Sequence, residues 1–146
     1  MAGLGWIGKN TMLIHSEQGS YFFLTILLST AELEYDQPSK TNHCGTCTAC
    51  LDQCPTDAFP APYVLDATKC ISYLTIEHRG SIADELKQQM GDWVFGCDIC
   101  QDVCPWNRRG PQQSEPDFVA NERLNCLDIE QLFQTTEDSF RASYRH

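Results

Sequence analysis

The positions of the cysteines constrain this sequence more than any other feature. Nine of the 146 residues are cysteine. Four lie in one run, Cys44-Gly-Thr-Cys47-Thr-Ala-Cys50-Leu-Asp-Gln-Cys54-Pro55, and three lie in a second, Cys97-Asp-Ile-Cys100-Gln-Asp-Val-Cys104-Pro105. Cys70 lies between the two runs and Cys126 follows them. Eight thiolates in and between two such runs are enough to hold two metal clusters with four ligands each.

The spacing C-x2-C-x2-C-x3-C-P of the first run is typical of bacterial two-cluster ferredoxins. In those proteins the fourth cysteine of the run ligates the other cluster. The same division predicts that one 4Fe–4S cluster is bound by Cys44, Cys47, Cys50 and Cys104. The second cluster is then bound by Cys54, Cys97 and Cys100, with Cys70 as the remaining sulfur ligand. Cys126 is left over and is predicted to be structural.

Zinc and disulfides are the alternative uses of so many cysteines. Two tetrahedral four-thiolate zinc sites would also use eight cysteines, but zinc ribbons usually carry separated C-x2-C pairs. A disulfide framework is disfavoured because the cysteine count is odd and the N-terminus does not resemble a signal peptide. The most apolar window, residues 21–28, is too short to cross a bilayer. We therefore expect a cytoplasmic protein with no membrane partner.

The charge balance disfavours tight binding of nucleic acid by the chain alone. Ten Lys and Arg residues face twenty Asp and Glu residues, which gives a formal net charge of −10. Such a surface repels phosphate backbones at long range. Any contact with nucleic acid would need local basic residues such as Arg79, Lys87, Arg108 and Arg109.

The composition predicts an α+β fold in three parts. Residues 11–15 and 21–29 are rich in aromatic and branched residues and predict two strands of a hairpin, with Gly19 in the turn. The cysteine-rich part covers residues 44–110, where helices are predicted over residues 66–79 and 81–90, the second with Ser81 as its N-cap. Pro55 is predicted at the first position of a helix after Cys54. Residues 111–146 begin with a Pro-rich boundary and are predicted to be helical.

The segment Gly3-Leu-Gly5-Trp-Ile-Gly8 fits the dinucleotide-binding pattern G-x-G-x-x-G. That pattern is meaningful only between a strand and a helix, and here no strand is predicted before it and no helix after it. We interpret it as a glycine-rich turn where backbones pack closely. Alternatively, its backbone amides face a bulky cofactor together with Lys9 and Asn10.

Four segments together resemble epoxyqueuosine reductases. They are Ala2-Gly-Leu-Gly-Trp-Ile-Gly-Lys-Asn-Thr11, the first cysteine run, Tyr73-Leu-Thr-Ile-Glu77, and Gly96-Cys-Asp-Ile-Cys-Gln-Asp-Val-Cys-Pro-Trp-Asn107. The resemblance covers nearly the whole chain. It implies an oxidoreductase that reduces epoxyqueuosine to queuosine in transfer RNA, and the family's cluster ligands correspond to the same eight cysteines in the same crossed division.

The resemblance also implies a second cofactor, cobalamin, to which the two 4Fe–4S clusters pass electrons. Residues 1–43 would be the C-terminal part of a cobalamin-binding domain, with Gly8, Lys9, Asn10 and Ser72 near the cofactor. Family members are much longer, so we expect a fragment cut at both ends that is inactive by itself. No catalytic residue can be assigned in it. The expected partners are the transfer RNA substrate and an external low-potential electron donor, and the expected state is a monomer.

Two other functions use the same cysteine pattern. A stand-alone two-cluster ferredoxin would only carry electrons, although small ferredoxins have no need of the Gly3–Thr11 segment or the hairpin. A reductive dehalogenase would use the same cofactors on an organohalide. Those enzymes are usually exported behind a twin-arginine signal, which this sequence does not show.

Overall fold

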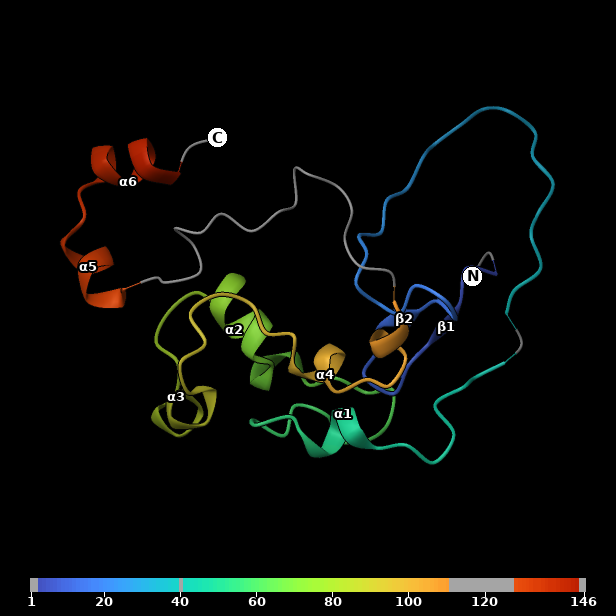
Figure 1. Cartoon of the computed structure of the whole chain (residues 1–146), viewed down its shortest axis with the longest axis horizontal. Helices are drawn as coiled ribbons and strands as arrows, with labels where there is room; N and C mark the ends of the chain where they lie inside the picture. Colours follow the sequence, from blue (N-terminus) through green and yellow to red (C-terminus); the bar gives the residue numbers. More distant parts are fainter. Residues whose placement is uncertain (1–2, 40, 111–127, 145–146) are drawn as a thin grey trace. The chain divides into compact units, whose positions relative to one another are not determined.

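The structure is a computed structural model that describes residues 3–39, 41–110 and 128–144 (Figure 1). The chain forms two compact units, Met1–Pro111 and Gln112–His146. The predicted border between residues 43 and 44 lies inside the first unit. The elements of the first unit are β1 Trp6–Ile7, β2 Leu13–Ile14, α1 Ala49–Asp52, the 3-10 helix η1 Ala67–Lys69, α2 Ile71–Ile76, α3 Asp84–Met90, α4 Ile99–Asp102 and the 3-10 helix η2 Asn107–Arg109.

The glycine-rich segment forms one arm of a small antiparallel hairpin. β1 pairs with β2 so that Trp6 lies opposite Ile14. A Cβ atom on Gly5 would lie 2.0 Å from the Ile14 carbonyl oxygen, so only glycine allows the backbones this close. The residue after Gly8 begins a turn, in which the Gly8 amide donates to the Met12 carbonyl at 2.8 Å. The predicted close packing of backbones in this segment is confirmed at Gly5, but the segment contains strand β1 and the turn follows Gly8.

The second predicted strand, residues 21–29, was wrong. β2 lies within the predicted strand 11–15, and His15 pairs with Gly19 across the predicted turn, but residues 21–29 follow in no regular element. Their large apolar side chains face solvent, with Phe23 and Leu27 each 92 % exposed. β-propensity reflects packing against neighbouring strands, and no strand of the described residues lies beside this segment.

Each cysteine run contains one short helix, and these helices contact each other. α1 includes Cys50, and its first turn closes where the Leu51 and Asp52 amides donate to the Thr48 carbonyl. Cys54 and Pro55 follow this helix in a turn, so the predicted helix beginning at Pro55 was wrong. In the second run α4 includes Cys100 in the same way. The contact between α1 and α4 brings the two runs together.

The predicted helix over residues 66–79 is interrupted at Cys70. η1 ends at Lys69, Cys70 is extended with φ −70° and ψ 122°, and α2 begins at Ile71. Asp66 caps η1 because its carboxylate accepts a hydrogen bond from the Thr68 amide at 3.0 Å. The extended backbone at Cys70 separates the two short helices.

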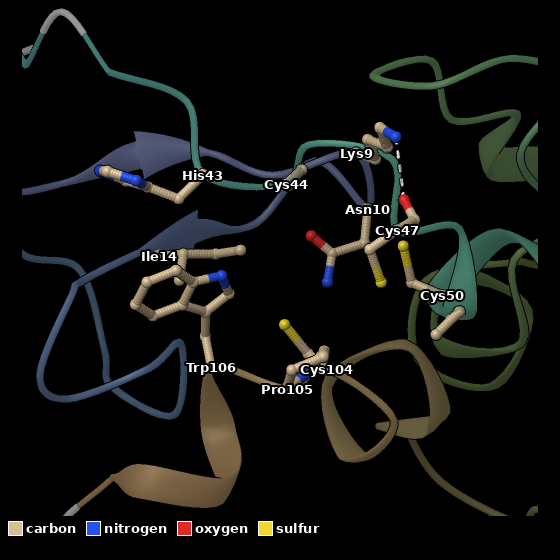
Figure 2. A pocket seen from close by; sticks show the side chains of 11 residues that line it. Lys9, Asn10, Ile14, His43, Cys44, Cys47, Cys50, Cys104, Pro105 and Trp106 are labelled. Atoms are coloured by element: carbon tan, nitrogen blue, oxygen red, sulfur yellow. Dashed lines mark hydrogen bonds between the residues drawn. The ribbon is translucent and has the colours of Figure 1, made fainter.

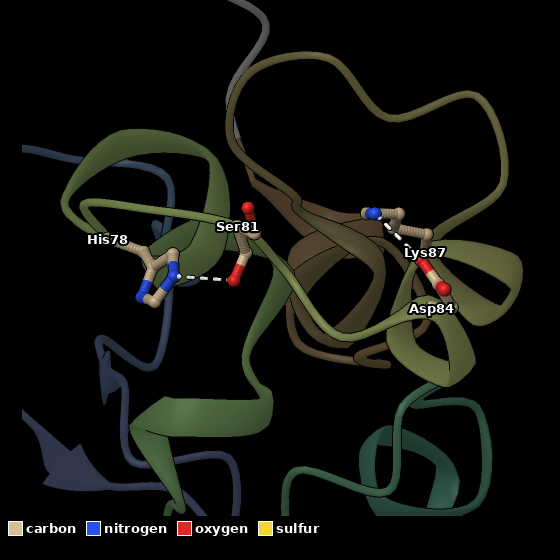
Figure 3. Close-up of polar contacts among 4 residues, drawn as sticks. All are labelled: His78, Ser81, Asp84 and Lys87. Atoms are coloured by element: carbon tan, nitrogen blue, oxygen red, sulfur yellow. Dashed lines mark hydrogen bonds and ion pairs between the residues drawn. The ribbon is translucent and has the colours of Figure 1, made fainter.

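The helix predicted from Ser81 begins three residues later, and Ser81 is not its N-cap. α3 starts at Asp84 with Ala83 in the cap position, and no side chain caps it. The Ser81 carbonyl oxygen instead lies 3.4 Å from Nε2 of His78 (Figure 3). Asp84 in the first turn pairs with Lys87 at 2.8 Å. The negative charges of Asp84 and Glu85 in the first turn interact favourably with the helix dipole, so they stabilise this end of α3 without a cap.

The first unit has two small buried clusters instead of one large core. Trp6, Ile14 and Cys104 form the first, with Cys44 and Trp106 packed against it. Ile71, Leu74 and Met90 form the second, with Ile82, Leu86 and Cys97 packed against it. Both clusters include cysteines of the two runs.

The second unit contains the helices α5 Ile129–Gln134 and α6 Glu137–Tyr144. Asp128 caps α5 by accepting from the Glu130 amide at 2.9 Å, and Arg141 pairs with Glu137 on α6. The helical prediction for residues 111–146 is confirmed in these two helices, where Phe133 of α5 is exposed. Cys126 lies outside the described residues.

Candidate iron–sulfur centre

The first cysteine run is folded as a tight loop whose conformation is fixed by local hydrogen bonds. The Cys47 amide donates to the Cys44 carbonyl at 3.0 Å, and the Cys44 amide donates to Oδ1 of Asn42 at 3.0 Å. Gly45 has φ +49°, a value that favours glycine, and this allows the chain to reverse direction between the first two cysteines.

The second run is fixed by similar contacts. The Gln101 amide donates to the Asp98 carbonyl at 2.8 Å, and the Cys104 amide donates to the Gln101 carbonyl at 3.0 Å. Gly96, with φ +70°, precedes the run and donates its amide to Oγ1 of Thr75 on α2 at 2.9 Å. This bond connects the beginning of the second run to the helix that follows Cys70.

Cysteines from both runs surround one cavity of about 250 Å³. Its lining includes Cys44, Cys47 and Cys50 from the first run and Cys104 from the second. Figure 2 shows Cys104 facing Cys47 and Cys50 across this space. The structure thus brings together the four cysteines that the spacing assigns to one cluster, although Cys104 is separated from Cys50 by more than fifty residues of chain.

The other four predicted ligands form a second group beside the second buried cluster. Cys97 packs against Ile71, Leu74 and Met90. The pKa of the Cys100 thiol is raised to about 12, mainly by burial and then by the nearby thiols of Cys97, Cys50, Cys70 and Cys54, in that order. Burial also raises the pKa of Cys97, and the nearby thiols of Cys70 and Cys54 raise it as well. Cys54, Cys70, Cys97 and Cys100 are therefore electrostatic neighbours in the structure.

Several thiols so close together cannot all ionise in a metal-free chain. The pKa of Cys50 is likewise raised, first by burial and then by Cys104, Cys44 and Cys47, although a backbone hydrogen bond lowers it. A bound metal reverses this balance because coordination deprotonates a thiol outright. Both groups of thiols are thus suited to bind a metal centre with several positive charges, such as the iron ions of a cluster.

Aromatic rings cover the first cavity on one side. Trp106 and His43 line the cavity, and Trp6 packs edge-on against both, with ring centroids 4.9 Å and 4.7 Å away. Trp6 is 5 % exposed, and its indole N–H has no hydrogen-bond acceptor among the described residues. These rings keep water from the wall formed by Cys44 and Cys104. Of the other candidates considered from sequence, Trp93 is partly exposed, and His15 accepts hydrogen bonds from the amides of its own turn.

The predicted cofactor-binding residues lie at the cysteine loops. Lys9 donates from Nζ to the carbonyls of Gly45 and Cys47, each at 2.8 Å. Asn10 donates from Nδ2 to the Cys100 carbonyl at 3.1 Å and accepts the Met12 amide at 3.2 Å. A Cβ on Gly8 would lie 2.6 Å from the Ile14 side chain. Ser72 is half-buried in α2, where its carbonyl accepts from the Thr75 hydroxyl.

A polar network joins the end of the hairpin to the second run, and sequence reasoning did not find it. Asn107 accepts the Ser20 amide at 2.6 Å and donates to the Gln101 carbonyl at 2.7 Å. The Ser20 hydroxyl donates to Oε1 of Gln101 at 2.8 Å. The partners are more than eighty residues apart, so no local pattern announces them. The sequence signal for Asn107 is that it ends the segment Gly96–Asn107, one of the four that carry the family resemblance.

A single metal ion does not fit the cysteines as well as a cluster does. A zinc ion needs its sulfurs at about 2.3 Å from one point. Within residues 3–39, 41–110 and 128–144, no three His, Cys, Asp or Glu side chains are grouped closely enough to hold one ion. The eight described cysteines form no disulfide. In the same part of the chain, no helix is long and apolar enough to cross a membrane.

Residues 43–107 match the family model of the 4Fe-4S double cluster binding domain. The matched residues include all eight cysteines of the two groups.

The chain as a whole is similar to epoxyqueuosine reductases. It is 47 % identical over 144 residues to the epoxyqueuosine reductase of Cellulophaga algicola, covering 99 % of this chain and 47 % of that protein. It is 50 % identical over 139 residues to the one from Pseudomonas aeruginosa, covering 95 % and 38 %. The resemblance predicted from the sequence motifs is thereby confirmed, and the chain spans less than half the length of these relatives.

Solved structures give the same result. A crystal structure of selenomethionine-labelled epoxyqueuosine reductase matches with a TM-score of 0.90 and 34 % identity over 99 % of this chain and 38 % of that one. A crystal structure of epoxyqueuosine reductase with an epoxyqueuosine-modified tyrosine transfer RNA stem loop matches with a TM-score of 0.82 and 32 % identity, also over 99 % and 38 %.

Proposed function

We propose that this chain binds two 4Fe–4S clusters in the crossed division predicted from the spacing. Cys44, Cys47, Cys50 and Cys104 would hold the first cluster, and Cys54, Cys70, Cys97 and Cys100 the second. The observation that carries this proposal is the cavity shared by Cys104 and the three cysteines of the first run. A ligand from the other run reaches this cavity because α1 and α4 are in contact.

The protein's own residues prepare these sites. When bound, the clusters supply one-electron transfer at low potential. The loop at Gly45 and the helices α1 and α4 hold the thiols in position before any metal arrives. Trp6, His43 and Trp106 limit the access of water and oxygen to the first cavity. Ile71, Leu74 and Met90 cover Cys97 of the second group in the same manner.

Metal analysis of the full chain, reconstituted with iron and sulfide without oxygen, tests the ligand assignment. We expect about eight irons and eight sulfides per chain. Cys104→Ser should prevent binding of the first cluster, and Cys97→Ser should prevent binding of the second. Each variant should lose about half of the iron. Cys126→Ser is the matched control and should keep all eight irons. Full iron binding in Cys104→Ser, or zinc in place of iron, would refute the assignment.

We further propose that the chain works as part of an epoxyqueuosine reductase, which reduces epoxyqueuosine to queuosine in transfer RNA. The names of the similar proteins and the structure with a modified stem loop support this activity. These names favour it over a reductive dehalogenase. We extend the proposal to residues 1–43 as part of a cobalamin-binding domain, to a cytoplasmic monomer, and to an external low-potential electron donor.

The residues expected at cobalamin fit that role only in part. Asn10 is 2 % exposed and both ends of its amide are engaged with backbone groups, so its side chain does not reach a second cofactor. Lys9 already uses two donors on carbonyls of the first cysteine run. Any contact between the Gly8–Asn10 segment and cobalamin therefore uses backbone groups or the third donor of Lys9.

Because Lys9 and Asn10 are already bonded to groups of the protein itself, one alternative function is favoured, a stand-alone electron-transfer module. Binding of cobalamin to the iron-loaded chain separates the two. A change in the cobalamin absorption spectrum on mixing is expected for part of a cobalamin enzyme, and no change is expected for a simple electron carrier. Cys126→Ser should behave as the unaltered chain.

The activity itself is tested in a full-length protein that contains this chain, with a stem loop that carries epoxyqueuosine, cobalamin and dithionite. Digestion of the RNA and mass spectrometry would show the loss of one oxygen atom from the nucleoside. Activity that persists in Cys97→Ser would contradict the role of the second cluster. The acidic composition predicts that binding of the stem loop to the chain alone is weak.

A further inference from the structure

Lys9 connects the hairpin to the loop that holds the first three cysteines. Its ammonium group donates to the Gly45 and Cys47 carbonyls at 2.8 Å each, across 36 and 38 residues of chain. Lys9 also lines the cavity that Cys44, Cys47, Cys50 and Cys104 surround, as Figure 2 shows. A lysine has three donors, so these two bonds leave one available toward the cavity or solvent.

The positive charge of Lys9 is not neutralised by a carboxylate in the described part of the chain. The ion pairs there are Lys87–Asp84 and Arg141–Glu137. Both partners of Lys9 are neutral carbonyls, which orient the ammonium but do not cancel its charge. A full positive charge is thus held at the wall of the first cavity.

The positive charge of Lys9 affects how easily the first cluster is reduced. A 4Fe–4S cluster with four thiolates is negative, and one electron taken up without a proton makes it more negative by one unit. A fixed cation nearby stabilises the reduced form more than the oxidised form, and so raises the reduction potential. Hydrogen bonds and charges around the sulfurs are known to set cluster potentials.

We propose that Lys9 is a positioning residue that fixes the loop of Cys44 to Cys50 and raises the reduction potential of the first cluster. The first cluster then accepts an electron from the external low-potential donor more readily. This inference rests on the proposed clusters.

The test is an anaerobic redox titration of the full iron-loaded chain with dithionite, followed by electron paramagnetic resonance. Lys9→Gln keeps an amide donor for the carbonyls but removes the charge. It should disfavour reduction of one cluster about tenfold, which corresponds to a potential about 59 mV more negative for one electron, and leave the other unchanged. Lys9→Arg keeps the charge and should keep the original potential. Lys87→Gln is the control for loss of a surface charge and should shift neither cluster.

An unchanged potential in Lys9→Gln, equal shifts in both clusters, or the same shift in Lys87→Gln would overturn the inference. If Lys9→Gln fails to take up iron, Lys9→Arg decides the question, because a changed potential with the charge retained contradicts the role of charge. Iron content of the unaltered chain is measured first. Fewer than eight irons there would count against the cluster assignment and not against Lys9.

Discussion

The side chain of Asn10 donates a hydrogen bond to the backbone carbonyl of Cys100, ninety residues further along the chain. The same side chain accepts the Met12 amide, so it holds the turn of the hairpin and the second cysteine run at once. Asn10 is almost fully buried. One amide side chain thus connects the N-terminal hairpin with a predicted ligand of the second cluster.

Replacement of Asn10 by alanine should destabilise the chain by about 1–3 kcal/mol, because it removes the partners of the partly buried Cys100 carbonyl and Met12 amide. The urea midpoint of the iron-loaded chain, followed by circular dichroism and by absorbance of the clusters, measures this. Asn42→Ala is the matched control. Asn42 also accepts a backbone amide, that of Cys44, but it is exposed, so water replaces its bond. Equal midpoints for the two variants would contradict the structural role of Asn10.

Rising pH should destabilise the metal-free chain between about pH 9 and pH 12. The pKa of Cys100 is raised from 9.0 to about 12, mainly by burial, so above pH 9 the unfolded chain loses a proton that the folded chain retains. The stability is fully present below pH 9 and falls by up to roughly 4 kcal/mol by pH 12. The melting temperature of the metal-free chain between pH 7 and pH 11 measures the effect.

Two controls isolate this effect of Cys100. Cys100→Ser should flatten the decline in melting temperature but not remove it. The thiols of Cys50 and Cys97 are also raised in pKa, and so is Tyr21, by burial and by its hydrogen bond to Asp102. The iron-loaded chain should show no such decline near pH 9, since its thiols are already deprotonated by the metal. A melting temperature that rises with pH in the metal-free chain would be incompatible with the buried thiols described here.

Alanine substitutions at two glycines distinguish the cost of a steric clash from the cost of backbone strain. Gly19 and Gly96 have φ of +72° and +70°, so alanine at either position is strained by about 1 kcal/mol. A Cβ on Gly19 would lie 2.1 Å from Oδ1 of Asn107, whereas a Cβ on Gly96 meets nothing within 4 Å. Gly19→Ala should therefore cost about 1–3 kcal/mol more than Gly96→Ala. Comparison of their free energies of unfolding tests this, and equal values would show that Asn107 does not pack against the turn.

Loss of Trp6 should expose the first cluster to oxygen. Trp6 is buried against Trp106 and His43 and packs with Cys44 and Cys104. Trp6→Ala should destabilise the chain by about 3–5 kcal/mol and speed the loss of cluster absorbance in air. Trp93→Ala removes the same side chain from a position 38 % exposed and should do neither to a similar extent. Equal rates of decay in air would show that the Trp6 ring does not shield the cluster.

Local sequence patterns predicted the elements that depend on neighbours in the chain. The close backbone packing at Gly5 and strand β2 appear where composition and spacing predicted them. The predicted strand over residues 21–29 failed because a strand needs a neighbour to pair with, and propensity alone does not supply one. Ser81 has the chemistry of an N-cap, but the chain adopts the cap conformation at Ala83 instead. Pro55 follows α1, because the helix forms earlier, around Cys50.

The sequence by itself determined the chemistry of this protein, because the spacing of cysteines along a short loop limits which metal centre they can surround. It also determined the resemblance to epoxyqueuosine reductase, which is carried by contiguous motifs. Only the tertiary structure decided what Lys9, Asn10 and Asn107 do. Their hydrogen-bond partners lie from two to ninety residues away, and most of these contacts exist only after α1, α4 and the hairpin have packed together. Pairings between distant segments follow from the packing of whole elements, which no local pattern encodes.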